Sequence, residues 1–153
     1  MTEPEIGPWA GFTVAGVRVR ARPGQTDLGS LWGRLAEHNP SRLPRVGAPR
    51  AFGVGFNFDP AAQTFDYLAG YEIAAGAAVP EEFQIVEIPA GTYAAFWTTL
   101  PSLMETIHRA NHVWLPASGY RRGDGPEFEL YDERFDPGKA DSPMAFVIPV
   151  VPR

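Results

Sequence analysis

Two glutamates stand two residues apart in a short segment that is otherwise aromatic and aliphatic. Glu127 and Glu129 belong to residues 127–132 (EFELYD), and a strand there would place both on one face, about 7 Å apart at a rise of roughly 3.3 Å per residue. If both carboxyls are partly buried, desolvation and mutual repulsion raise the pKa of at least one. A carboxylate among aromatic faces can bind a large organic cation through charge pairing and cation–π attraction. Glu127 is more typical of a solvated strand end, so Glu129, flanked by Phe128 and Leu130, is the stronger functional candidate.

Aromatic residues that carry polar groups share faces of the predicted strands. By even spacing, Tyr71 shares a face with Tyr67, Tyr93 with Trp97, and Tyr131 with Glu129. Stripes that serve only the core favour Phe, Leu and Val, whereas these positions offer hydroxyl, indole and carboxyl groups. We therefore expect part of this set to line a binding site rather than the core.

Other catalytic and metal-binding chemistries find little support. The histidines are His38, His108 and His112; the last two have the spacing of a helical metal pair, but no glutamate lies between them as in HExxH. The chain has no cysteine, no GxSxG segment and no phosphate-binding glycine loop, and residues 53–55 (GVG) indicate close backbone packing within a strand. The sequence predicts neither a metal site nor a cofactor.

Length and charge narrow the class of protein further. The chain has 153 residues and 44% apolar residues, which suits one globular domain over residues 1–153. Its 13 basic and 18 acidic side chains give a net charge of −5, so nucleic acid is an unexpected direct partner. No apolar run is long enough to cross a membrane, and the N-terminus is acidic rather than leader-like. A cytoplasmic protein is expected, and a homodimer or a protein partner stays open.

Glycine and proline divide the chain into short elements. The first predicted helix begins at the cap Thr26-Asp27 and ends near residues 38–39, and the second runs from Ser102 until Pro116 ends it. The predicted strands cover residues 12–22 with a bulge near Gly16, then 51–58, 65–75, 83–88, 92–98, 127–132 and 144–150.

The spacing of these elements repeats. An offset of 76 residues relates Val17 to Tyr93, Phe52 to Phe128, Tyr71 to Val147 and the helix cap Thr26 to Ser102. The repeat predicts an α+β fold in which a β-α-β-β unit occurs twice with pseudo-twofold symmetry. Two such units bury their helices by packing them on one antiparallel sheet, and the junction leaves a central groove suited to a small molecule.

Five segments together resemble a known family, the GyrI-like small-molecule-binding domain, also called the effector-binding domain of AraC- and MerR-type regulators. They are Leu31-Trp32, residues 65–72 (FDYLAGYE), 87–96 (EIPAGTYAAF), 114–120 (WLPASGY), and 128–131 (FELY) with 148–150 (IPV). The resemblance runs from about Phe12 to Val151, the expected ordered core. It implies the duplicated fold and a central aromatic pocket with one acidic residue that pairs with lipophilic cations.

The resemblance also implies roles for particular residues. The acidic residue corresponds to Glu129, and the pocket walls correspond to Tyr71, Tyr93, Trp97 and Tyr131, with Trp114 contributing from the second helix. The regulators fuse this domain to a helix-turn-helix reader, and the first predicted strand here begins too early for one, so we expect a stand-alone member without a DNA-binding domain.

The family offers three functions for such a member. The first, which we favour, is binding of lipophilic, cationic or aromatic small molecules through the aromatic pocket and Glu129. The second is a cofactor-independent hydrolase that opens cyclopropane rings of cytotoxic natural products, with Glu129 as general base and Tyr71 as its partner. The third is a gyrase-inhibitor-like interaction protein, which the scattered acidic pairs of the sequence favour least.

Overall fold

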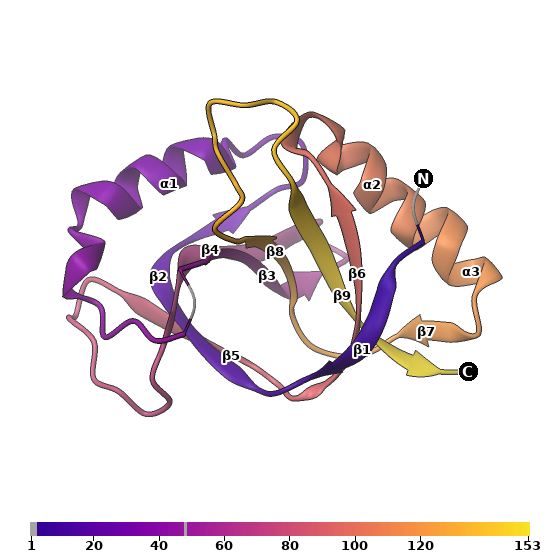
Figure 1. The fold of residues 1–153 in the computed structure, drawn as a ribbon, viewed down its shortest axis with the longest axis horizontal. Coiled ribbons are helices and arrows are strands. Elements are labelled where there is room, and N and C mark those ends of the chain that lie inside the picture. Colours follow the sequence, from indigo (N-terminus) through magenta and orange to yellow (C-terminus); the bar gives the residue numbers. More distant parts are fainter. Residues whose placement is uncertain (1–2, 48) are drawn as a thin grey trace.

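Nine strands form the framework of the protein, which is described here from a computed structural model covering residues 3–47 and 49–153 (Figure 1). The strands are β1 (Glu5–Trp9), β2 (Phe12–Ala21), β3 (Ala51–Asp59), β4 (Thr64–Ile73), β5 (Gln84–Ile88), β6 (Gly91–Thr98), β7 (Tyr120–Arg122), β8 (Glu127–Tyr131) and β9 (Met144–Pro152). The seven predicted strands are among them. The strands β1 and β7 are additional, and β1 lies before residue 12, where we expected the ordered core to begin.

Helix α1 (Leu28–Glu37) forms where the sequence predicts it. The Asp27 side chain accepts a hydrogen bond from the backbone N–H of Ser30 at 3.3 Å, which satisfies one of the free amides of the first turn. Leu31 and Leu35 are buried one turn apart and hold the helix to the sheet. A short 3-10 turn, η1 (Pro40–Arg42), follows the helix.

The second helical region is longer than predicted. The 3-10 turn η2 (Leu100–Ser102) leads into α2 (Leu103–Arg109), a wider π-helical turn η3 (Ala110–Trp114) and α3 (Leu115–Ala117). Pro116 therefore lies inside the last short helix instead of ending α2. The proline directly follows the residues of the π-helical turn, and the helical stretch ends one residue after it, at Ala117.

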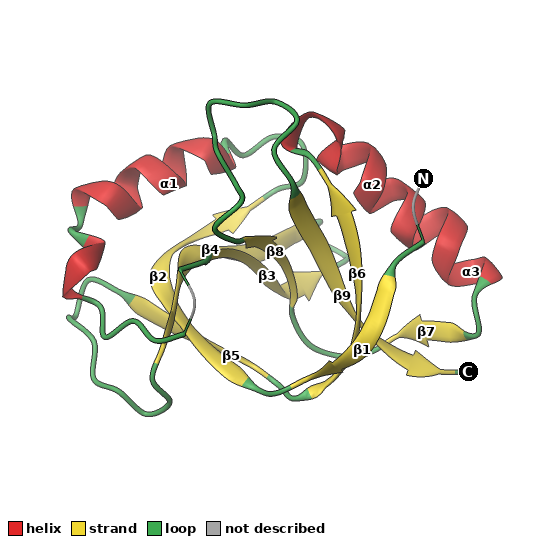
Figure 2. Cartoon of the chain, in the orientation of Figure 1, coloured by secondary structure: helices red, strands yellow, loops and turns green. Residues whose placement is uncertain are grey.

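The strands pair into one open antiparallel sheet in the order β1-β6-β9-β8-β3-β4-β2-β5, with β7 paired to the end of β9. Both helices lie on the same side of this sheet, and the sheet bends away from them (Figure 2). The two β-α-β-β units are β2-α1-β3-β4 and β6-α2-β8-β9, which confirms the predicted duplication. The strand that precedes each unit in the chain pairs with the other unit. The strand β1, before the first unit, pairs with β6 of the second, and β5, before the second unit, pairs with β2 of the first.

The register shows how far the repeat holds. At the junction of the units, Gly53 of β3 pairs with Glu129 of β8, so the two positions that the 76-residue offset relates lie side by side on the pseudo-twofold axis. Farther out the offset drifts. It is 77 between Ala69 and Phe146, and 79 between Val17 and Phe96, when positions are matched through strand pairing.

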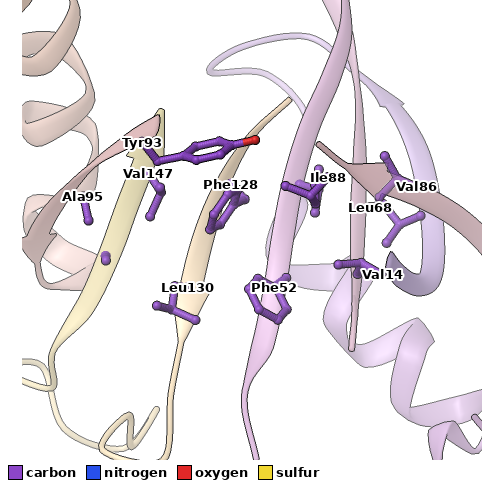
Figure 3. Close-up of a cluster of buried hydrophobic side chains, with 12 residues drawn as sticks. Val14, Phe52, Leu68, Val86, Ile88, Tyr93, Ala95, Phe128, Leu130 and Val147 are labelled. Carbon is purple, nitrogen blue, oxygen red and sulfur yellow. The ribbon is translucent and has the colours of Figure 1, made fainter. Parts of the chain in front are cut away.

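The sheet buries side chains on both faces. On the helical side, one cluster packs under α1 and another under α2. The opposite face carries the cluster of Figure 3, which includes Phe52, Phe128 and Tyr93 and is flanked by the half-buried Trp9 and Phe12. Alternate residues of β8 therefore point to opposite faces of the sheet. Phe128 and Leu130 fill this core, and Glu127 and Glu129 face the helices.

The bulge predicted near Gly16 is absent, because β2 pairs with β4 in continuous register from Thr13 to Ala21. Gly16 faces Gly70 across these strands, and a Cβ on Gly16 would overlap the carbonyl oxygen of Ala69. The glycine is required by this close approach of two backbones.

Candidate functional site: a groove between the two helices

A groove runs between α1 and α2 along the junction of the two units. It contains two adjoining cavities that share four lining residues, Leu28 of α1, Leu103 of α2, Tyr67 of β4 and Glu129 of β8. The two leucines and the pair Tyr67–Glu129 thus lie where the cavities meet. Each cavity has the volume of a site for a drug-sized molecule.

We name the cavities by one residue each. The Trp32 lobe, of about 640 Å³, is lined in addition by Gly29, Trp32, Ala51, Tyr71, Leu100, Tyr131, Phe135 and Pro137. The Phe58 lobe, of about 620 Å³, is lined in addition by Arg22, Pro23, Gly24, Gln25, Gly53, Gly55, Phe58, Asp59, Pro60, Gln63, Thr64, Phe65, Met104, Ile107, Glu127, Phe128 and Phe146.

The Trp32 lobe is built from aromatic rings that hold one another in place. The ring of Tyr131 lies edge-on to Trp32, with centroids 5.6 Å apart, and to Phe135, with centroids 4.8 Å apart. Phe135 belongs to the loop between β8 and β9, which rises between the two helices (Figure 1). Helix, strand and loop therefore each contribute a wall, and apart from Glu129 the described lining residues of this lobe carry no charge.

The Phe58 lobe is lined by more kinds of side chain than the Trp32 lobe. Phe58 and Phe65 stack with their centroids 5.6 Å apart, and Met104 of α2 is 66% exposed at the rim. An exposed methionine beside stacked rings is an adaptable apolar surface. Besides Glu129, this lobe is lined by the carboxylates of Glu127 and Asp59 and by the guanidinium of Arg22.

Glu129 is held in a fixed position by two tyrosines. The hydroxyls of Tyr67 and Tyr131 both donate hydrogen bonds to its Oε1, at 2.9 and 2.6 Å. Gly53 makes room for this arrangement, because a Cβ there would overlap the Tyr67 hydroxyl and come within 2.8 Å of Oε1. Among the described residues no protein group donates to Oε2, so this oxygen can accept from a molecule in the groove.

The surroundings of Glu129 shift three pKa values upward. Burial raises the pKa of Glu129 above its ordinary value of 4.5; the two tyrosine hydrogen bonds oppose the shift, and the charge of Glu127 adds to it. Burial, followed by the negative charge of Glu129, raises the pKa of Tyr67 and of Tyr131. Both phenols are therefore protonated donors across the physiological pH range.

The carboxylate of Glu129 has no cationic partner within residues 3–47 and 49–153. Glu127 differs, since its Oε1 lies 2.9 Å from Nη1 of Arg122 in an ion pair. Burial raises the pKa of Glu127 as well, and Arg122 opposes that shift. A desolvated carboxylate without a counter-charge is costly unless something compensates it. The arrangement is suited to pairing with a positive charge supplied from outside.

Three of the six predicted ligand-contacting residues meet in the groove. Glu129, Tyr71 and Tyr131 all line the Trp32 lobe. The guanidinium of Arg45 covers the ring of Tyr71, with its central carbon 3.8 Å from the ring centroid. Tyr71 makes no described hydrogen bond to Glu129, and the hydroxyl partners are Tyr67 and Tyr131 instead.

Tyr93 and Trp97 lie away from both lobes, on the opposite face of β6. Tyr93 is buried in the core cluster of Figure 3, where its hydroxyl donates to the carbonyl of Pro89 at 2.7 Å. Trp97 packs against the same cluster, and its ring is covered by the guanidinium of Arg134, 4.5 Å from the ring centroid. We correct their assignment as pocket walls, because the odd-numbered residues of β6 point away from the helices.

Trp114 also lies outside the groove. It packs beneath the helices between Phe96, with centroids 5.3 Å apart, and Tyr120, at 6.2 Å. The π-helical turn that contains Trp114 directs it into this cluster rather than toward the groove. Its role as a contributor from the second helix is likewise corrected.

Three residues of the site were not predicted from the sequence: Tyr67, Trp32 and Gly53. Tyr67 was visible as the neighbour of Tyr71 on one strand face, yet nothing local showed that it reaches Glu129 across β3. The sequence places Trp32 on the apolar stripe of α1, but it does not show whether the indole ring faces the core or the groove. These contacts depend on the register of three strands.

The histidines and the helices were the remaining candidates for a metal cluster and for a membrane span in the described parts of the chain. No group of three or more metal-ligating side chains occurs there, and the pair His108 and His112, with ring centroids 4.8 Å apart, lacks a third ligand. No helix in the described ranges is long and apolar enough to cross a bilayer.

The fold and the groove define an effector-binding domain of the type that the sequence resembles. Residues 5–150 match the family model of Cass2, described as integron-associated effector binding protein, and the chain belongs to this family. The resemblance to effector-binding domains is thus confirmed over nearly the whole length.

Comparison with individual proteins gives a consistent picture of the fold. The chain is 29% identical over 143 residues to the transcriptional regulator BrlR of Pseudomonas aeruginosa, covering 91% of this chain and 52% of BrlR, so it spans about half of that relative. The structure of SAV2435 bound to tetraphenylphosphonium is similar with a TM-score of 0.77 at 16% identity, over 98% of this chain and 94% of the other. A hydrolase from Listeria innocua is similar with a TM-score of 0.56 at 13% identity, over 97% and 92%. At these identities the two structures show the fold alone.

Proposed function

We propose that this chain binds lipophilic aromatic cations in the groove, with Glu129 as the counter-charge. The observation that carries the proposal is the carboxylate of Glu129, which is enclosed by aromatic rings and has no Lys, Arg or His partner among the described residues. Glu127, two residues away on the same strand, has such a partner and serves as the internal contrast.

The chemistry of the groove favours a cation over an anion or a neutral molecule. The two tyrosines occupy Oε1, which leaves Oε2 for a ligand. The faces of Trp32, Tyr131 and Phe135 present negative π density, which attracts a diffuse positive charge. A bound cation would also offset the desolvation of the carboxylate, so charge and shape recognition reinforce each other.

The relatives agree with this proposal. The matched family is one of effector-binding proteins, and tetraphenylphosphonium, with which SAV2435 was solved, is a lipophilic aromatic cation. We extend that ligand class to this chain because the cavities have a suitable volume and Glu129 supplies the charge.

The test compares two ligands of nearly equal size and different charge. Methyltriphenylphosphonium is a cation and triphenylphosphine oxide is neutral, and their affinities are measured by calorimetry for the natural chain and for Glu129→Gln. A charge-assisted contact is worth about 1.5–3 kcal/mol, so we expect the variant to lose roughly 10- to 100-fold in affinity for the cation and little for the oxide. Glu133→Gln, which removes an exposed carboxylate, is the control for net charge.

Two results would contradict the proposal, the first for the role of Glu129 as counter-charge and the second for binding as the function. Equal losses for the cation and the oxide in Glu129→Gln would show that the residue only shapes the groove. Incubation with cyclopropane-bearing aromatic compounds, followed by mass spectrometry, would reveal a hydrolase by the gain of one water. In that case Glu129 would be the general base, and Tyr67 or Tyr131, which contact it, would orient it in place of Tyr71.

A further inference from the structure

The two lobes of the groove are related by the pseudo-twofold axis of the fold. The axis passes between Gly53 and Glu129, which pair directly, and the register is symmetric about them. On one side Ala51 pairs with Tyr131, and on the other Gly55 pairs with Glu127; an offset of 76 exchanges the two pairs. The Trp32 lobe lies on the first side and the Phe58 lobe on the second.

The chemistry of the two lobes does not follow this symmetry. The position that holds Tyr131 in the Trp32 lobe corresponds to Gly55 in the Phe58 lobe, and Glu127 corresponds to Ala51. One lobe is thus aromatic and uncharged apart from Glu129, whereas the other also carries Glu127, Asp59 and Arg22 and has a net negative lining. The backbone of the groove is symmetric, but the side chains at its two ends differ. Such a groove is complementary to a ligand whose two ends differ as well.

Glu127 retains the capacity to bind a positive group. Arg122 pairs with Oε1 only, and no described protein group donates to Oε2. The guanidinium of Arg122 also packs against Phe58, 5.6 Å from its ring centroid, and Arg122 is not among the lining residues of the lobe. Glu127 and Glu129, about 7 Å apart along the strand, therefore both face the groove. Asp59 and Arg22 also line the Phe58 lobe, and the guanidinium of Arg22 donates a hydrogen bond to the carbonyl of Ala62. The lining thus holds three carboxylates and one guanidinium, with Arg122 outside it behind Glu127.

We propose that the groove selects elongated ligands with two positive centres, an aromatic cation in the Trp32 lobe beside Glu129 and a second, ammonium-like group in the Phe58 lobe beside Glu127. This inference rests on the proposed function and adds the class of ligand to it. Monocations occupy the Trp32 lobe and leave the second carboxylate unused. Dications of matching length use both.

The test uses two ligands that differ at one end. (3-Aminopropyl)triphenylphosphonium carries an ammonium at the end of its chain, and butyltriphenylphosphonium ends in a methyl group at a similar length. We expect the amine to bind about 5- to 10-fold more tightly to the natural chain, the range for a partly exposed ion pair that gains a charged hydrogen bond. Glu127→Gln should remove this preference, whereas Glu129→Gln should weaken both ligands alike.

A second variant covers the case in which Glu127→Gln disturbs Arg122. Met104→Trp narrows the Phe58 lobe from an exposed rim position and should also reduce the preference for the amine. Equal affinity of the two ligands for the natural chain would overturn the inference while leaving the proposed function intact. A preference that survives both variants would overturn it as well, and binding of neither ligand would instead refute the proposed function.

Discussion

At the scale of single residues, the site is defined by a carboxylate that the protein keeps at a cost to its stability. Burial raises the pKa of Glu129, which means that ionised Glu129 is less favourable in the folded chain than in the unfolded chain. The hydrogen bonds from Tyr67 and Tyr131 recover part of this cost. Function and stability therefore oppose each other at this residue.

Glu129→Gln should make the ligand-free protein more stable at neutral pH. Because the folded pKa is raised, the stabilising contribution of Glu129 is complete below its ordinary pKa of 4.5 and is lost as the pH rises through the folded pKa. Glutamine keeps an oxygen for the tyrosine hydroxyls and carries no charge. We expect a higher Tm for the variant at pH 7 and a shrinking difference toward pH 4, measured by thermal unfolding beside Glu133→Gln. A lower Tm for the variant at pH 7 would contradict this account.

At the scale of elements, β3 forms the floor of the groove because it lacks side chains at the positions that matter. Gly53 and Gly55 lie in β3 between β4 and β8. The missing Cβ of Gly53 leaves the space in which Tyr67 reaches Glu129, and a Cβ on Gly55 would contact Phe58, Phe65 and Glu127. The glycines weaken the strand itself. The pairing of β3 with β4 on one side and β8 on the other compensates for this weakness.

Gly53→Ala should disrupt the site more than the fold. The added methyl group overlaps the Tyr67 hydroxyl and must displace it or Glu129, so we expect at least a 10-fold loss of cation affinity with a destabilisation of about 1–3 kcal/mol. Gly33→Ala, in α1 with no atom within 4 Å of the new Cβ, is the control and should stabilise the helix by about 1 kcal/mol. Unchanged cation affinity in Gly53→Ala, measured by calorimetry, would show that the Tyr67–Glu129 contact is dispensable.

At the scale of the whole molecule, the two units are interlocked. Each contributes one edge strand to the other, β1 to β6 and β5 to β2, and β3 pairs with β8 across the axis. Trp9 of β1 contacts Phe12, Tyr93 and Phe128, which come from both units. Neither unit can lose its structure without exposing the core of the other.

This interlocking predicts a single unfolding transition. The four tryptophans lie in β1, α1, β6 and the second helical region, so fluorescence reports on both units and far-UV circular dichroism on the whole sheet. We expect urea curves from the two methods to coincide, as they do for a cooperative domain. Two separated midpoints would show that the units unfold independently.

The sequence predicted the fold more completely than the site, and particular residues show why. Glu129 could be found because the period-two alternation with Phe128 and Leu130 is local to one strand. Tyr93 and Trp97 were assigned to the groove by the resemblance and by the strand face that they share. Alternation shows that two residues share a face but not which side of the sheet that face lies on, and in the structure it lies away from the helices.

The strand β1 was missed for a related reason. It contains Pro8 and Gly7, which break the usual strand pattern, and it is tolerated because it pairs on one side only, at the edge of the sheet. Contacts such as Tyr67 with Glu129 join residues 62 positions apart. Such contacts depend on how neighbouring strands pair in register, and the pairing register cannot be read from one segment of the sequence.

The pairing of Gly53 with Glu129 has a consequence for how such a receptor can arise. Two identical half-length chains joined side by side would place the same amino acid twice at this contact. Two acids there would repel each other, and two glycines would offer nothing to a positive ligand. When the two halves belong to one polypeptide, each can be substituted independently. One half can then supply the charge of Glu129, and the other can have Gly53, which leaves space for it.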